Sequence, residues 1–392
     1  MRKIALLTLA LFALNIANAQ DSLSRDTLIF TTVKENKITP VKNQASSGTC
    51  WSFSGLAFFE SELLRMGKPE VDLSEMFVVS HSYTDKADKY LRMNGTINFA
   101  AGGSFYDVLY VLQNHGIVPE SEMNGLNYGT DKHKHGELDA LTESIVKAMV
   151  KNPNKTISTA WKPAFQAVVD SYLGKLPAEF SENGKKYTPK SYVQSLGLNL
   201  NDYVSITSFT HHPFYGKFPI EIPDNWRWAE SYNVPLDEFI RIFDYAVENG
   251  YTIAWGSDVS ERGFTRDGIG ILPETKKENL VGTDQAKWVG GQPKDGKFDI
   301  KGPMQEENVT QESRQLGFDN YQTTDDHGMQ IFGIAKDQEG TPYYMVKNSW
   351  GTESKYKGIW YVSKPFVMSK TINILVHKDA IPKDIKKKMG GM

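Results

Sequence analysis

The chain of 392 residues contains a single cysteine, Cys50. A single cysteine cannot form an internal disulfide, so it is either a small buried apolar residue or a working thiol. Turn-forming residues precede it, and the segment 51–65 after it predicts a buried helix, because its first half is apolar on most faces. Cys50 thus stands at a helix start, where backbone N–H groups and the helix dipole favour a thiolate. This position indicates a nucleophile.

A thiolate nucleophile needs a histidine that carries its proton to the leaving group. Most of the eight histidines need no catalytic role to explain them. His133 and His135 lie in a polar loop, and His211 and His212 lie in a turn. These His-x-His and His-His pairs are a weak signal for a metal ion, since no third ligand motif lies nearby. The sequence therefore predicts no metal site and no cofactor.

His327 differs because two strand-like runs follow it, 329–334 and 343–348, separated by turn-forming residues. Folded as an antiparallel hairpin with its turn centred near residues 337–338, these runs place Asn348 opposite His327. The side-chain carbonyl of Asn348 would then hold the imidazole ring. A slip of one or two residues in this register leaves the two side chains close together.

Two further side chains fit this arrangement. Gln44 lies six residues before Cys50, and we expect it to direct an amide N–H across the intervening turn as an oxyanion donor. Trp350 lies two residues after Asn348, and we expect its ring to shield the hydrogen bond between Asn348 and His327 from water.

A glutamine, a cysteine, a histidine and an asparagine in this order resemble the site of the papain-like cysteine proteases. The stretches that carry the resemblance are Gln44 to Phe53 (QASSGTCWSF), Asp326-His327-Gly328 and Asn348 to Gly351 (NSWG). The resemblance implies that Cys50 is the nucleophile and that His327 is the general base and acid. It also implies that Asn348 orients the ring. Gln44 and the backbone N–H of Cys50 would be the oxyanion donors.

The spacing refines the resemblance. Cys50 and His327 are 277 residues apart, which is about twice the separation in ordinary papain-like enzymes. A long insertion of this kind is similar to those of the bleomycin hydrolase and aminopeptidase C branch. Other stretches agree with this branch: Asp72 to Met76 (DLSEM), Gly102-Gly103 with Tyr106-Asp107, Asn114 to Pro119 (NHGIVP), Trp255 to Val259 (WGSDV) and Met389 to Met392 (MGGM).

The resemblance implies a cysteine aminopeptidase, which removes N-terminal residues from peptides through a thiolate–imidazolium pair and an acyl-enzyme. Its C-terminal tail would lie in the cleft and gate it. The predicted substrate-binding residues are therefore Met392, Gly391, Gly102 and Gly103. Two alternatives stay open: an endopeptidase with an open cleft on the same core, and a catalytically silent binding protein of the same fold.

The resemblance also implies an α+β, papain-like fold of two lobes, with a helical lobe, an antiparallel β-barrel-like lobe and a long helical insertion. We expect a helix-rich lobe with the nucleophile, a helical insertion, a β-rich lobe with the histidine and the asparagine, and a C-terminal arm that enters the cleft. Their ranges are 39–130, 131–250, 251–365 and 366–392. Helices in the insertion show 3.6-residue periodicity. The resemblance implies that such helices make oligomer contacts and that the protein is a homo-oligomer, a hexamer.

The first 19 residues predict a signal peptide. They have a basic start, an apolar stretch from Ile4 to Leu14 and the small-residue pattern Ala17-Asn18-Ala19. The apolar stretch is too short to span a membrane, and no later segment approaches that length. We therefore expect a soluble protein in the periplasm or outside the cell. The net charge of −3 favours neither nucleic acid nor an anionic membrane, so the predicted partners are peptide substrates.

Overall fold

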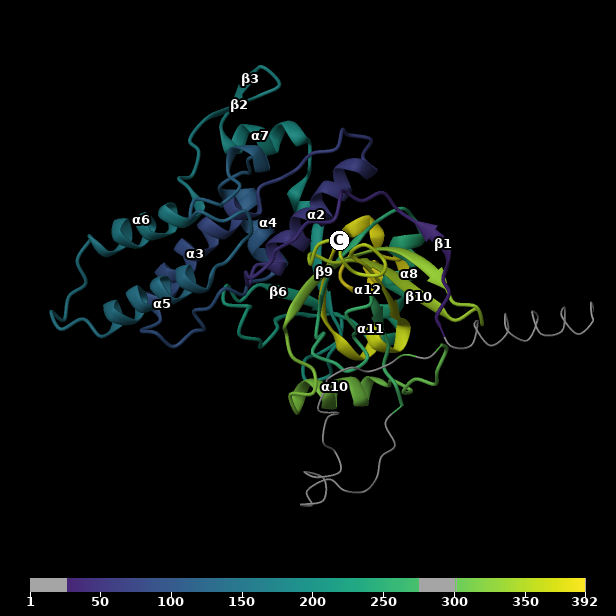
Figure 1. Ribbon diagram of the computed structural model, residues 1–392. Helices are drawn as coiled ribbons and strands as arrows, with labels where there is room; N and C mark the ends of the chain where they lie inside the picture. Colours follow the sequence, from purple (N-terminus) through teal and green to yellow (C-terminus); the bar gives the residue numbers. More distant parts are fainter. Residues whose placement is uncertain (1–26, 275–299, 301, 392) are drawn as a thin grey trace, which may run out of the picture.

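The computed structural model describes residues 27–274, 300 and 302–391, so the predicted signal peptide (1–19) and Met392 lie outside the described residues. Helices form one side of the molecule and a large sheet the other, with α2 (Cys50–Arg65) between them (Figure 1). This arrangement confirms the predicted α+β class with a helical and a β-rich lobe. None of the described helices has the length and apolar content that crossing a membrane requires.

The helical lobe packs around α2, whose residues from Trp51 to Leu63 are all buried, as its apolar sequence predicts. Local caps start the helices around it. Ser74 Oγ accepts the backbone N–H of Phe77 (3.0 Å), and Asp107 accepts that of Ser104 (2.8 Å). The other elements of this lobe are α3 (Glu75–Arg92), α4 (Phe105–Asn114), α5 (Gly136–Val150), α6 (Trp161–Leu173), α7 (Pro189–Leu196) and the hairpin of β2 (Phe180–Glu182) and β3 (Lys185–Tyr187).

The β-rich lobe contains one mixed sheet, in the order β5-β6-β4-β12-β7-β9-β10-β11-β8, with β1 paired to β9. The β4–β6 and β11–β8 pairs are parallel and the rest are antiparallel. The bounds are β1 (Thr31–Glu35), β4 (Tyr203–Thr207), β5 (Lys217–Pro219), β6 (Glu230–Asn233), β7 (Ile253–Ser257), β8 (Ile269–Gly270), β9 (His327–Lys336), β10 (Pro342–Lys347), β11 (Ile359–Ser363) and β12 (Thr371–His377).

Both faces of the sheet are buried, because successive side chains along its strands point into two different cores. Ala254 of β7 belongs to the core of the helical lobe, whereas its neighbours Ile253 and Trp255 belong to a second core on the opposite face. Helix α2 covers the first face. The second face is covered by α8 (Leu236–Glu248), α11 (Lys364–Lys370) and α12 (Lys383–Lys388), with α10 (Gln311–Asp319) against α11. Short 3₁₀ helices are η1 (Glu120–Glu122), η2 (Leu200–Asp202) and η3 (Lys378–Ala380).

The predicted hairpin after His327 is present as β9 and β10. Lys336 pairs with Pro342, so the turn is centred on residue 339, slightly later than predicted. A bulge between Met345 and Val346 then shifts the register by one residue. The turn is held by Asp337 Oδ1, which accepts two backbone N–H groups of the turn at 2.9 Å each.

Two of the predicted spans contain strands that the sequence analysis did not place there. The span 131–250 contains β4, β5 and β6, which extend the main sheet. The span 366–392 contains β12, which lies within the sheet between β4 and β7. Short strands such as β4 carry little periodic signal, and their pairing joins segments far apart in sequence.

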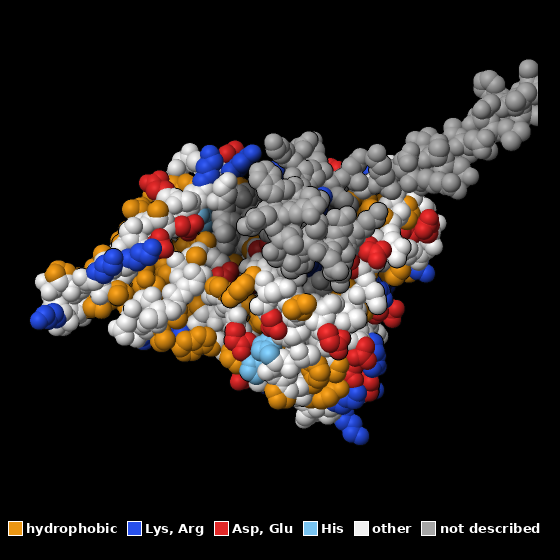
Figure 2. Space-filling view, turned by 90° about the horizontal axis from the view of Figure 1, so that it is seen from below, with side chains coloured by type: hydrophobic (Ala, Val, Ile, Leu, Met, Phe, Trp, Pro, Cys, Tyr) orange, Lys and Arg blue, Asp and Glu red, His pale blue; other side chains and the backbone are white. Residues whose placement is uncertain are grey.

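Figure 2 shows one face of the molecule, on which Lys and Arg side chains are interspersed with Asp and Glu side chains among the described residues. This distribution agrees with the small net charge of −3.

Candidate active site

Cys50 is the first residue of α2, as predicted. The start of the helix is fixed by Trp51, whose Nε1 donates to the carbonyl of Ala101 (3.1 Å) in the loop before α4. The backbone N–H groups of Gly328 and Trp51 lie near the thiol of Cys50 and lower its pKa. Gly328 permits this approach, since a Cβ atom there would lie 2.7 Å from Ser54 Oγ.

His327 opens β9, and its Nε2 lies 2.7 Å from Asn348 Oδ1. Both side chains are buried. The backbone N–H of Ser349 also donates to Asn348 Oδ1 (2.7 Å), which fixes the orientation of the amide. The ring of Trp350 stacks on the imidazole at a centroid distance of 4.6 Å. The hairpin contact and the shielding ring that the sequence predicts are therefore both present.

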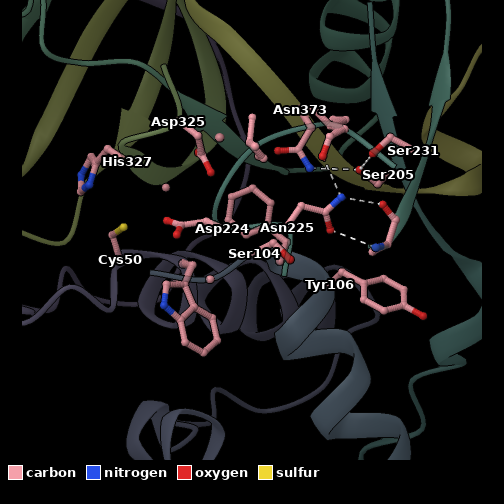
Figure 3. Close-up of a pocket in the computed structure, with 18 of the residues that line it drawn as sticks. Cys50, Ser104, Tyr106, Ser205, Asp224, Asn225, Ser231, Asp325, His327 and Asn373 are labelled. Atoms are coloured by element: carbon pink, nitrogen blue, oxygen red, sulfur yellow. Dashed lines mark hydrogen bonds between the residues drawn. The ribbon is translucent and has the colours of Figure 1, made fainter. Parts of the chain in front are cut away.

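Cys50 and His327 lie at the same end of one cavity (Figure 3). With Nε2 bonded to Asn348, the ring keeps Nδ1 for exchange with the thiol. This arrangement can perform nucleophilic attack with proton transfer, which is the chemistry of a thiol–imidazole pair.

Burial disfavours the thiolate of Cys50 and the imidazolium of His327 when each forms alone. It raises the pKa of the Cys50 thiol to about 12, an effect to which the carboxylates of Asp325 and Asp224 add. It lowers the pKa of His327 to about 4. The backbone N–H groups near the sulfur act in the opposite direction, and desolvation is the larger of the two effects. A proton that passes directly from sulfur to ring creates both charges together, and charges about 4 Å apart attract by about 4 kcal/mol at an effective dielectric constant near 20.

Gln44 is held behind the turn that precedes Cys50. Its Nε2 donates to the carbonyl of Ser47 (2.8 Å), and its Oε1 accepts from Ser349 Oγ (2.6 Å). One of its two amide hydrogens is thus engaged away from the substrate, and the residue is not part of the cavity lining. The second hydrogen is the one that an oxyanion role would need.

The cavity beside the catalytic pair is lined by residues of both lobes. One wall is formed by the start of α4 and the other by the sheet. Its lining is mixed, with apolar side chains such as Phe105, Ile220 and Ile222, and Figure 3 shows Asp224 and Asp325 between the catalytic pair and the far end. The polar residues at that end are Ser104, Tyr106, Ser205, Asn225, Ser231 and Asn373.

The predicted substrate-binding residues divide into two groups. Gly103 lines the cavity, and Gly102 lies against Asp224, since a Cβ atom on Gly102 would be 2.0 Å from Asp224 Oδ2. Gly391, in contrast, is exposed and outside the cavity lining, and Met392 lies outside the described residues. The tail leaves from α12, which packs with α8 on the opposite face of the sheet from α2.

Sequence reasoning missed the cavity carboxylates Asp224 and Asp325. Asp325 was within reach, because two adjacent acidic residues directly before a candidate catalytic histidine are a visible signal. Asp224 lies in the connection from β5 to β6, where no local motif marks it.

The His211–His212 pair does have a third potential ligand, Glu221, with ligand atoms within 4.8 Å of one another. Both Nε2 atoms bond to the carboxylate, at 3.0 and 2.7 Å. Gln315 Nε2 bonds to His211 Nδ1 (3.0 Å), while Gln315 Oε1 accepts the backbone N–H of Thr210 (2.6 Å). Hydrogen bonds thus join the two histidines to Glu221 and join His211 to Gln315.

Comparisons with known proteins agree with this geometry. Residues 29–174 match the papain family cysteine protease model, and residues 297–391 match the Peptidase C1-like family. The chain is 23% identical to Aminopeptidase C of Lactococcus lactis subsp. lactis, over 88% of this chain and 82% of the relative. It is 20% identical to Bleomycin hydrolase of Gallus gallus, over 96% and 90%.

A crystal structure of PepW from Lactobacillus rhamnosis superimposes with a TM-score of 0.69 at 19% identity, over 95% of this chain and 86% of that chain. This likeness shows a shared fold. One family match contains Cys50, and the other contains His327 and Asn348. The two matches together cover more than half of the chain, which belongs to the papain-like cysteine peptidases.

Proposed function

We propose that this protein is an aminopeptidase that removes N-terminal residues from peptides through an acyl-enzyme on Cys50. The observation that carries the proposal is the 2.7 Å contact between His327 Nε2 and Asn348 Oδ1 beside the single cysteine of the chain. Relatives named Aminopeptidase C and Bleomycin hydrolase, each matched over most of its length, support it.

In this proposal, the thiol of Cys50 passes its proton to Nδ1 of His327, and the sulfur attacks the carbonyl carbon of the scissile bond. The carbonyl oxygen takes the electron pair and is held by the backbone N–H of Cys50 and the second amide hydrogen of Gln44. The imidazolium then protonates the leaving amine as the C–N bond breaks. Water, deprotonated by His327, hydrolyses the thioester, and the released acid leaves the thiol restored.

The test compares aminoacyl fluorogenic amides that have a free amine with their N-acetylated counterparts. An aminopeptidase hydrolyses the first and rejects the second, whereas an endopeptidase with an open cleft accepts both. Cys50→Ala should abolish hydrolysis while the circular dichroism spectrum stays that of the native protein. Full activity in this variant would refute the mechanism, and equal rates on both substrate types would refute the aminopeptidase assignment.

Gating by the C-terminal tail is a second part of the proposal. Its support is the resemblance of the terminal Met-Gly-Gly-Met sequence and the free space around Gly390 and Gly391, where an added Cβ would contact nothing within 4 Å. Deletion of residues 390–392 should admit N-blocked peptides. If the shortened enzyme rejects them as strongly as the full chain does, the tail is not the gate.

Export and assembly complete the proposal. The N-terminal sequence supports cleavage before Gln20, and the family resemblance supports a homo-oligomer, a hexamer. Mass spectrometry of protein from the native host gives the mature N-terminus, and light scattering after size-exclusion chromatography gives the oligomer mass. An intact N-terminus, or a monomer mass, would contradict the respective part.

A further inference from the structure

Two carboxylates stand in the cavity next to the catalytic pair and approach it from different elements. Asp325 lies in the segment just before β9, and Asp224 lies in the connection from β5 to β6. Figure 3 shows both between the catalytic pair and the polar far end of the cavity. Both line the same cavity as Cys50, and both raise the pKa of its thiol.

Among the described residues, no cation faces Asp325. Its charged neighbours are Asp224, Asp326 and Asp258, all acidic, and no hydrogen bond or ion pair of its carboxylate is found there. Burial together with these carboxylates raises the pKa of Asp325 well above its usual range. This is the response of a partly buried carboxyl group that has no positive partner among the described residues.

The negative charge of Asp224 is only partly balanced by neighbouring groups. Asn98 Nδ2 donates to its Oδ1 at 3.3 Å, and the one nearby cation that acts on it is Lys86. The Lys86 ammonium, however, donates to the backbone carbonyls of Ala100 and Gly102. Burial raises the pKa of Asp224 as well, with Asp107 adding to the effect.

The other two acidic neighbours are engaged in structure. Asp326 accepts the backbone N–H groups of Val259 and Ser260 (2.8 and 3.1 Å). Asp258 accepts those of Ser260 and Thr324 (2.8 and 2.7 Å). They hold the loop ahead of β9, whereas Asp325 is left facing the cavity.

We infer that Asp224 and Asp325 form the binding site for the α-ammonium group of the substrate, an inference that rests on the proposed function. In an aminopeptidase substrate this group is attached to the carbon next to the attacked carbonyl, so its partner must lie beside the nucleophile. Both carboxylates do. A bound ammonium also offsets the negative charge of the two carboxylates, which disfavours the thiolate of Cys50. Binding of a substrate with a free amine therefore favours formation of the nucleophilic thiolate.

A metal ion is a less suitable occupant. Among the described residues, Cys50, Asp224 and Asp325 do not bring three ligand atoms within metal-binding distance of one another. A lysine or arginine side chain of the substrate would carry its charge several bonds from the reacting carbonyl, toward the far end of the cavity. That end presents hydroxyl and amide groups such as Ser205, Ser231 and Asn373.

The first experiment measures kcat/KM of Asp224→Asn, Asp325→Asn and the wild type on leucyl and N-acetyl-leucyl fluorogenic amides. Asp131→Asn, an exposed loop position outside the cavity, is the matched control. We expect each cavity variant to lose at least 10-fold on the free-amine substrate and to keep or gain activity on the acetylated one, while the control is unchanged. An equal loss on both substrates, or no loss on either, would overturn the inference.

Acetyl-lysyl and acetyl-arginyl amides test the competing occupant. If the wild type hydrolyses these acetylated substrates well and the cavity variants lose them selectively, the carboxylates bind a basic side chain and the inference is wrong. If the wild type cleaves acetylated and free-amine substrates equally, the proposed function itself fails. If it prefers free amines and both variants retain that preference, only the inference fails.

The second experiment is independent of turnover and follows the pH dependence of Cys50 alkylation by iodoacetamide, a neutral reagent. The groups that face the thiol are His327, Asp325 and Asp224. Removal of one carboxylate should shift the midpoint of alkylation to lower pH in Asp325→Asn and Asp224→Asn, and Asp325→Glu should restore the wild-type midpoint. An unchanged midpoint in both Asn variants would contradict the proposed effect on the nucleophile.

Discussion

Asn348 controls the imidazole of His327 through one atom, Oδ1, which lies 2.7 Å from Nε2. It does not exchange a proton with the substrate. Removal of Asn348 therefore loosens the ring and its tautomer but leaves the proton carrier in place.

We predict that His327→Ala lowers kcat by about 10²–10⁴-fold, the usual contribution of a general acid–base group. Asn348→Ala should lower it by less, with KM nearly unchanged in both variants. Steady-state kinetics on one aminoacyl amide gives the comparison. A larger loss in Asn348→Ala than in His327→Ala would show that the asparagine does more than orient the ring.

The single cysteine makes a stoichiometric prediction possible. One alkyl group per chain should inactivate the enzyme, because Cys50 is the only thiol and lies in the cavity. A chelator such as EDTA should leave activity intact, since the proposed steps use side chains alone. Intact-mass spectra recorded beside residual activity test both statements. Activity that survives complete alkylation, or that is lost to the chelator, contradicts this chemistry.

Arg227 determines where the connection from β5 to β6, and hence Asp224, can lie. Its Nε bonds to Asp107 of α4 (2.5 Å) and its Nη2 to Asp85 of α3 (2.8 Å). Its guanidinium also lies over the ring of Tyr110, 3.9 Å from the centroid. A largely buried arginine thus ties the loop of the β-rich lobe to two helices of the other lobe.

We predict that Arg227→Met lowers the free energy of unfolding by about 3–5 kcal/mol, because it leaves a buried carboxylate unpaired. It should also weaken the preference for free-amine substrates, as Asp224 loses its support. The control is Arg241→Met, which breaks the exposed pair with Asp384 and should destabilise the chain far less. Urea denaturation and the two-substrate assay measure both effects. Equal destabilisation of the two variants would contradict this role of Arg227.

The sequence predicted the features that depend on residues close together in the chain or on a strong local pattern. The helix start at Cys50 and the hairpin that joins His327 to Asn348 are of this kind, and the hairpin contact survived a small error in register. The pairing of β4 with β12, and the position of Asp224, depend on segments over 100 residues apart. Such contacts are selected by tertiary packing, which a local pattern does not encode.

At the scale of the whole molecule, the cavity lies where the two lobes meet. The starts of α2 and α4 form one wall, and strands β4, β6, β7, β9 and β12 contribute to the other. A ligand that fills the cavity therefore contacts both lobes and adds contacts between them.

We predict that a reversible leucine aldehyde with a free amine stabilises the whole chain against urea. At 100 times its dissociation constant the gain should be about 2.7 kcal/mol in the free energy of unfolding. The N-acetylated aldehyde at the same concentration should add much less, and Cys50→Ala should abolish most of the effect of both. Equal stabilisation by the two aldehydes would show that the free amine is not recognised.

The catalytic pair and several other residues of the cavity lining come from separate parts of the chain, and this separation affects how substrate preference can evolve. Ile220, Ile222, Asp224, Asn225 and Ala229 all come from the short segment between β5 and β6, which carries neither Cys50 nor His327. Mutations in this segment can alter which N-terminal residue is accepted while the bond-breaking groups are inherited unchanged. The roughly ten residues between these strands are therefore enough to change substrate preference, and the catalytic pair lies outside them.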